Sequence, residues 1–108
     1  MSDFEDILKT EYSSSFDEKR KRSMINSYYK YGPACKNYGE YKCMDALRNL
    51  EIRLQKYRET GNTEYLVDVA NFAMLEFMYP SIEGAAFTPT GDAQCEIAGF
   101  GVNQLKEV

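Results

Sequence analysis

The segment 64–79 constrains the fold of this chain most strongly, because its residues EYLVDVANFAMLEFMY are mostly apolar. The turn residues Asn62 and Thr63 precede it, and Pro80 ends it by displacing the preceding residue from helical geometry, so a single helix is predicted. Apolar side chains cover most of its circumference, whereas a surface helix confines them to one stripe. We expect this helix to be the buried centre of an all-α fold.

The segment 41–60 supplies the predicted partner of the central helix. Gly61 marks its end, and the short turn that follows favours antiparallel packing of the two helices. Its apolar residues alternate between spacings of four and three, as in an amphipathic helix: Cys43, Leu47, Leu50, Leu54 and Tyr57. We predict a small helical bundle with the hairpin 41–60/64–79 as its core.

Two more helices are predicted at the N-terminus, over 3–12 and 16–31. The start of each helix is marked by a serine and by a glutamate three residues after it, the spacing at which hydroxyl and carboxylate cap a helix. The two pairs are Ser2 with Glu5, and Ser15 with Glu18. The second ends at a Gly-Pro pair, and a connector with one helical turn is expected over 34–40.

The first of these helices is short but amphipathic. Its apolar residues Phe4, Ile7 and Leu8 have the i, i+3, i+4 spacing that puts them on one face. We expect this helix to dock on the bundle as a flap.

The length of 108 residues corresponds to one domain, 1–108. Within it, residues 81–108 contain scattered glycine and proline and are predicted to form an irregular arm. Two long helices are too few to enclose the central one, so we expect a second copy to complete the core. The predicted homo-oligomer contact lies on the central helix, at Val69, Phe72, Ala73 and Leu75.

The composition excludes several chemistries. The chain has no histidine, which removes Ser-His and Cys-His catalysis and His-ligated zinc. Cys35, Cys43 and Cys95 are odd in number and form no CxxC pair, which is typical of reduced thiols in a cytoplasmic protein. An acidic start and the lack of a long apolar run predict neither a signal peptide nor a membrane span. We expect no cofactor and no metal.

Glu64, Asp68 and Asn71 form one polar stripe along the central helix, because they stand at i, i+4 and i+7. One interpretation is a solvent edge with Glu64 at the positive end of the helix. The other is a site at which carboxylates bind a cation or anchor a ligand.

The segment VDVANFAML, residues 67–75, resembles the acidic helix of the all-α nucleoside triphosphate pyrophosphohydrolases of the MazG type. The resemblance implies carboxylates gathered around Mg²⁺ by an ExxE helix and an ExxD helix. Asp68 matches the last Asp of that pattern, but Tyr65 stands in place of its Glu, and the preceding helix offers only Glu51. We therefore assign no catalytic residues and keep a diverged hydrolase as an alternative.

Three segments resemble an uncharacterised family of small phage and prophage accessory proteins of Gram-positive bacteria. They are KYGPA at 30–34, YRETGNTEYLVDVANFAM at 57–74 and EFMYP at 76–80. The resemblance implies an accessory protein that acts in the host bacterial cytoplasm, where such proteins often counter host defence.

Basic and aromatic residues are interleaved between residues 19 and 42. Arginine and lysine neutralise phosphates and tyrosine rings stack on bases, so this composition is typical of nucleotide binding, although a solvated helix face is the other interpretation. The candidate ligand-binding residues of this segment are Arg20, Arg22, Tyr28, Tyr31 and Tyr38. They join Glu64, Asp68 and Asn71.

The charge is divided unevenly, at +2 over residues 1–62 and −6 over residues 63–108. The overall charge of −4 disfavours duplex nucleic acid, whose binding depends on summed phosphate neutralisation. The resemblance to phage accessory proteins and the basic, tyrosine-rich segment together favour non-enzymatic counter-defence by sequestration of a small nucleotide immune signal. The main alternative is an inhibitor that docks on a host defence protein such as a CRISPR nuclease through the acidic half.

Overall fold

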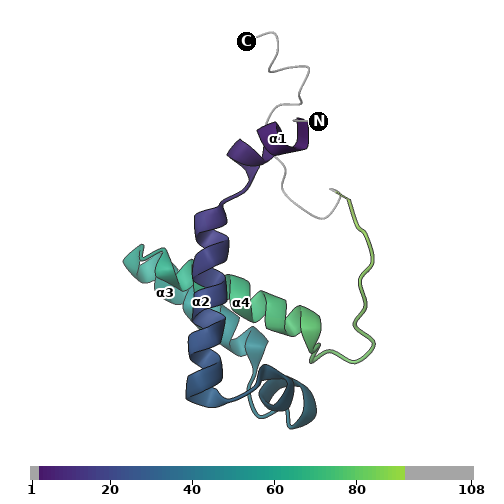
Figure 1. The fold of residues 1–108 in the computed structure, drawn as a ribbon. Helices are drawn as coiled ribbons and strands as arrows, with labels where there is room; N and C mark the ends of the chain where they lie inside the picture. The colour runs from purple at the N-terminus through teal and green to yellow at the C-terminus, as the bar shows by residue number, and fades with distance from the viewer. Residues whose placement is uncertain (1–2, 92–108) are drawn as a thin grey trace.

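The computed structural model describes residues 3–91 as an arrangement of helices (Figure 1). The elements are α1 (Asp3–Glu11), α2 (Ser14–Tyr31), the short π-helix η1 (Cys35–Glu40), α3 (Ala46–Thr60) and α4 (Glu64–Met78). This range contains no strand. The predicted all-α fold is confirmed.

The hairpin of α3 and α4 is the best-packed part of the described chain. Gly61 takes the left-handed conformation (φ 70°), and its N–H donates to the Tyr57 carbonyl oxygen at 2.7 Å, which ends α3. The Asn62 side-chain oxygen then accepts from the Glu64 N–H at 3.0 Å, so Asn62 caps α4. The end of α3 and the start of α4 are therefore separated by three residues, as the sequence predicted.

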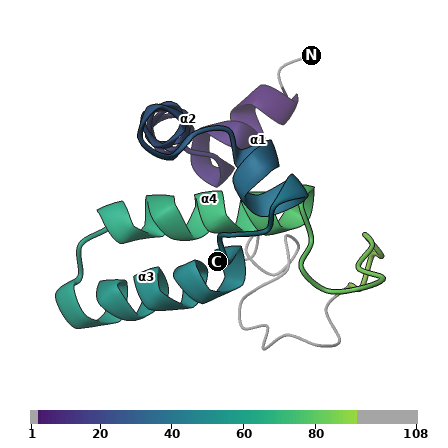
Figure 2. The same cartoon turned by 90° about the horizontal axis from the view of Figure 1, so that it is seen from below.

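The central helix α4 lies between α3 on one side and α2 on the other (Figure 2). Its buried residues Val67, Asn71 and Leu75 are four positions apart and form one face. The predicted central position is correct, but the apolar surface of α4 is not covered all round. Phe77, at its C-terminal end, is 71 % exposed.

Two predicted helix starts are wrong, because other residues cap these helices. Helix α3 begins after Asp45, whose carboxylate accepts from the Arg48 N–H at 3.0 Å, so residues 41–45 are not helical. Helix α2 begins after Ser13, whose hydroxyl accepts from the Phe16 N–H at 3.0 Å. The serine run 13–15 offers three hydroxyls, and the first of them is the cap.

The connector between α2 and α3 is more ordered than one turn. The backbone at Gly39 of η1 lies close to the ring of Tyr79, because a Cβ at position 39 would be 3.0 Å from Tyr79 Cδ1. The Asn37 side chain donates to the Tyr31 carbonyl oxygen at 2.8 Å. The π-helix thereby joins the C-terminal ends of α2 and α4.

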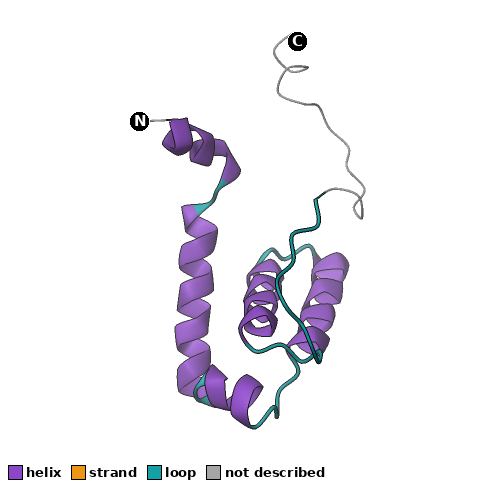
Figure 3. Cartoon of the chain, turned by 90° about the vertical axis from the view of Figure 1, so that its right-hand side faces the viewer, coloured by secondary structure: helices purple, strands orange, loops and turns teal. Residues whose placement is uncertain are grey.

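The first helix and the arm differ from expectation. Helix α1 continues from the N-terminal end of α2, away from the hairpin, and all of its residues are exposed (Figure 3). It does not dock on the bundle as predicted. The arm is irregular and exposed over 81–91, and its remainder lies outside the described residues.

Candidate functional site

An open groove of about 1,020 Å³ separates α2 from the α3–α4 hairpin. Helix α2 lines one wall along most of its length, and α3 and α4 line the other, with η1 at one end. The groove exists because α2 crosses the hairpin rather than lying along it (Figure 1).

The lining combines apolar and charged side chains. Its half-buried or buried apolar residues are Met24, Ala34, Met44, Leu66, Val67, Phe72 and Leu75. Its charged residues are four cations and two carboxylates: Lys19, Arg22, Lys30, Arg53, Glu64 and Asp68. An apolar surface bordered by an excess of positive charge suits a ligand that has both a flat apolar part and an anionic part.

Seven of the eight predicted ligand-binding residues line this groove. Arg22, Tyr28 and Tyr31 come from α2 and Tyr38 from η1, whereas the stripe Glu64, Asp68 and Asn71 comes from α4. The fold thus brings together two clusters that are about 40 residues apart in the sequence. The eighth residue, Arg20, does not line the groove.

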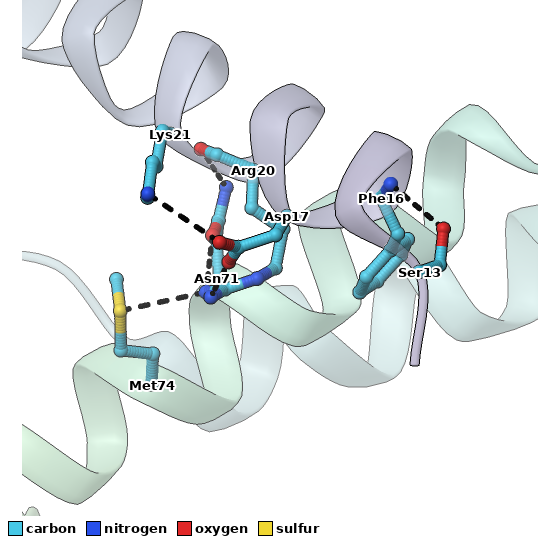
Figure 4. Close-up of polar contacts among 7 residues, drawn as sticks. All are labelled: Ser13, Phe16, Asp17, Arg20, Lys21, Asn71 and Met74. Carbon is cyan, nitrogen blue, oxygen red and sulfur yellow. Dashed lines mark hydrogen bonds and ion pairs between the residues drawn. The ribbon is translucent and has the colours of Figure 1, made fainter. Parts of the chain in front are cut away.

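Arg20 and Asn71 join α2 to α4 (Figure 4). Asn71 is 5 % exposed, and its amide nitrogen donates to the Arg20 carbonyl oxygen at 3.1 Å. The Arg20 guanidinium donates to the Asn71 side-chain oxygen at 3.4 Å and to the Asp17 carboxylate at 2.7 Å. Both ends of the Asn71 amide are therefore occupied, and this pair has a structural role whatever else it binds. We call Asp17, Arg20 and Asn71 the polar clip.

The electrostatics of the polar clip favour an ionised carboxylate. Hydrogen bonds from Arg20, and then from Tyr12, hold the pKa of Asp17 below its ordinary value of 3.8. The ion pair with Lys21, at 3.4 Å, acts in the same direction.

Asp68 lies across the groove in a different environment. Burial raises the pKa of its carboxyl group, and the charge of Arg53 opposes this effect while that of Glu64 adds to it. The Arg53 Nε is 3.5 Å from the Asp68 carboxylate, and the guanidinium also stacks over the Tyr65 ring at 5.5 Å. The charge of the Asp68 carboxylate is therefore partly balanced by Arg53 of α3, and the carboxylate is only partly exposed to solvent.

The tyrosines of the groove present rings at different depths. Tyr28 and Tyr31 on α2 are exposed, and Tyr28 makes an edge-to-face contact with Tyr29 at 5.6 Å. Tyr38 on η1 is half-buried, and this burial, with a smaller effect of Cys43, raises the pKa of its hydroxyl. The two α2 rings are available for stacking at one end of the groove.

Three cations of the groove were not among the predicted ligand-binding residues, namely Lys19, Lys30 and Arg53, although Lys19 and Lys30 belong to the basic segment identified from the sequence. Lys19, Arg22 and Lys30 are separated by three and eight residues, which puts them near one face of a helix. That periodicity separates them from Arg20, which the sequence analysis chose. Arg53 reaches the groove because of the way α3 and α4 pair, and no spacing in the sequence indicates this.

No protein-family model, curated protein or solved structure matches this chain. Within residues 3–91, cysteine, aspartate and glutamate side chains form no group of three or more that could hold a metal ion. None of the helices in the described part of the chain is long and apolar enough to cross a membrane.

Proposed function

We propose that this chain binds a small phosphorylated nucleotide in the groove and sequesters it without chemical turnover. One observation carries the proposal, which is that the cations of α2 and the exposed rings of Tyr28 and Tyr31 line the same groove. Phosphate and base have complementary requirements, because phosphate needs donors with positive charge and a base needs a flat apolar surface.

The phosphate is assigned to Arg22 with Lys19 and Lys30. Arg22 is well suited to it, because its side chain is 75 % exposed and its nearest carboxylate, Glu18, is 4.0 Å away. A guanidinium with so weak an ion pair keeps most of its donors for a ligand. Arg20 is reassigned to the polar clip, where its guanidinium donates to Asn71 and Asp17.

The carboxylates on the opposite wall complete the nucleotide site. Glu64 and Asp68 are acceptors, and the hydroxyls of a ribose and the amino groups of a base are donors. A site with donors on one wall and acceptors on the other discriminates nucleotides from inorganic phosphate.

The biological context of the proposal is counter-defence by a phage accessory protein. A binding protein removes a signal stoichiometrically, so it needs no catalytic group, and a chain of 12.4 kDa is small enough to be made in quantity. The resemblance to small phage and prophage proteins supports this context. We therefore propose a nucleotide immune signal of the host as the ligand class.

A thermal-shift screen tests the proposal. The panel contains cyclic nucleotides, ADP-ribose derivatives and nucleoside triphosphates, each with and without Mg²⁺. A ligand at a hundred times its Kd stabilises the fold by about 2.7 kcal/mol, which raises Tm by several degrees in a domain of this size. Silence across the panel would contradict the proposal, as would conversion of the bound nucleotide to products.

The matched variants are Arg22→Ala and Arg58→Ala. Both residues are exposed arginines, but Arg58 is on α3 and does not line the groove. Loss of a charge-assisted contact of about 1.5–3 kcal/mol predicts that Arg22→Ala weakens binding by about ten- to a hundredfold, whereas Arg58→Ala binds like wild type. Equal affinities of the two variants would place the ligand elsewhere.

A further inference from the structure

Helix α1 has an apolar face that nothing covers in a single chain. Phe4 is 81 % exposed, and Ile7 and Leu8 on the same face are also exposed. A helix of nine residues is marginal in water without packing against a partner. The amphipathic pattern of α1 therefore indicates a docking surface.

The joint between α1 and α2 directs this face away from its own bundle. Ser13 caps α2 by accepting from the Phe16 N–H, so the chain turns out of α1 immediately before α2 begins. No residue of α1 is buried against α2 or the hairpin. The joint instead presents α1 outward (Figure 3).

The charge of α1 indicates what it can pack against. The helix has four acidic residues and one lysine, whereas the groove lining has four basic residues and two acidic ones. Asp3 and Glu11 lie four residues before and after Ile7, so they border the apolar face. The groove lining combines apolar side chains with Lys19 and Arg22, whose charge is opposite to that of Asp3 and Glu11.

A second exposed apolar set does not match α1. It follows the end of α4 and contains Phe77, Met78, Ile82 and Phe87. The charged residues beside it in the sequence are Glu76 and Glu83, which have the same sign as α1. Like charges disfavour that contact.

We propose that α1 of a second copy of this chain docks in the groove between α2 and the α3–α4 hairpin, and that the two copies exchange α1 reciprocally. Such a contact is the helix-in-groove mode within a two-fold symmetric dimer. The fit in length is good, because nine residues span about 13.5 Å and the eighteen of α2 about 27 Å. The proposal depends on the groove and not on its ligand.

In this arrangement the dimer contact is made by α1 and the groove, and not by the residues of α4 that the sequence predicted. Leu75 is already buried within one chain, so it has no surface left to offer a second copy. The exchanged α1 also shares Lys19 and Arg22 with the phosphate assigned above. A nucleotide and α1 therefore compete for one end of the groove.

The first test is the mass of the full chain in solution, measured by light scattering across the micromolar range. The expected mass is twice 12.4 kDa. The double variant Phe4→Ser/Leu8→Ser is expected to give a folded monomer, because α1 contributes nothing to the core. The control Tyr29→Ser removes an equally exposed ring, at 82 %, that lies outside the groove, and it is expected to stay dimeric.

A charge swap tests where α1 docks. Lys19→Glu/Arg22→Glu and Asp3→Lys/Glu11→Lys are each expected to shift the dimer toward monomer at least tenfold, and the four substitutions together are expected to restore it. A wild-type monomer throughout the range would overturn the proposal. A dimer that survives Lys19→Glu/Arg22→Glu would also overturn it, because α1 would then be packing elsewhere. Neither result depends on a nucleotide being present.

Discussion

The two contacts made by α4 differ in kind. Toward α3 it forms a hairpin closed by a three-residue turn, with glycine and asparagine satisfying the backbone at its ends. Toward α2 it makes fewer contacts, centred on the buried amide of Asn71 and the Arg20 side chain. The polar clip holds α2 against α4 at the point where the two helices cross. Away from that point their surfaces diverge, and the space between them is the groove. The better-packed interface of α4 is thus the one with α3, and the proposed binding site lies at the other.

The largest expected effect on stability comes from shortening a side chain on the buried face of α4. Leu75 is 4 % exposed, and replacing it with alanine should cost about 2–5 kcal/mol of unfolding free energy because a cavity remains. Urea denaturation followed by circular dichroism measures this cost. The control Phe77→Ala, at an exposed position of the same helix, should change stability by less than about 0.5 kcal/mol. Similar costs for both variants would mean that this face is not the core.

The polar clip should give a smaller and more local effect. Asn71→Ala removes the hydrogen bonds of its amide with the Arg20 carbonyl oxygen and the Arg20 guanidinium, at a cost of about 1–3 kcal/mol. Hydrogen exchange should show lower protection of the α2 amides, whereas α3 and the adjoining part of α4 keep theirs. Asn26→Ala, an exposed asparagine of α2, is the matched control. Equal loss of protection in α3 would show that the two interfaces are not separable.

The neighbouring arginines of α2 should separate stability from binding. The Arg20 side chain is 26 % exposed and joins the clip, whereas that of Arg22 is 75 % exposed. Arg20→Ala should therefore lower Tm more than Arg22→Ala, which within one chain removes only an exposed ion pair with Glu18 at 4.0 Å. Calorimetric melting of the two unliganded variants measures this difference. Equal Tm values would contradict the structural role of the polar clip.

The smallest effects are those of pH, and the two interfaces should respond with opposite sign. The folded pKa of Asp17 is lowered, so the stability it contributes is present above about 3.8 and is lost as pH falls through the lowered pKa. The folded pKa of Asp68 is raised, so stability increases as pH falls through that raised pKa. Asp17→Asn should therefore flatten the acid loss of stability, and Asp68→Asn should steepen it. Denaturant titrations at a series of acidic pH values measure both, and slopes of the same sign would refute the assignment.

The sequence predicted the hairpin well because its signals are local. Helical periodicity, Gly61 and Pro80 all act within a few residues, and they located both ends of α4 to within one residue. The start of α2 was missed because three adjacent serines compete for one capping position. The stripe of α4 was found, but the role of Asn71 depends on the approach of α2 from 51 residues away, which no local pattern encodes.

The groove itself follows from a crossing of helices and could not be read from periodicity. The clusters that line it were identified separately, and only the fold places Tyr28 and Tyr31 in the same groove as Glu64 and Asp68. Docking of α1 on its own bundle was predicted from the amphipathic pattern, and this prediction is wrong. In a single chain α1 extends away from the hairpin with all of its residues exposed (Figure 3), and no local pattern encodes that direction.

Titration of the isotopically labelled protein with the nucleotide panel, followed by NMR, tests the central claim most directly. With a nucleotide that binds, the amides of Ser23, Ser27 and Asp68 in the groove should shift, whereas those of Gln55 and Glu59, exposed on α3 outside the groove, should stay fixed. Shifts confined to residues outside the groove, or none for any nucleotide, would contradict the claim that the separation between α2 and the hairpin is a nucleotide site.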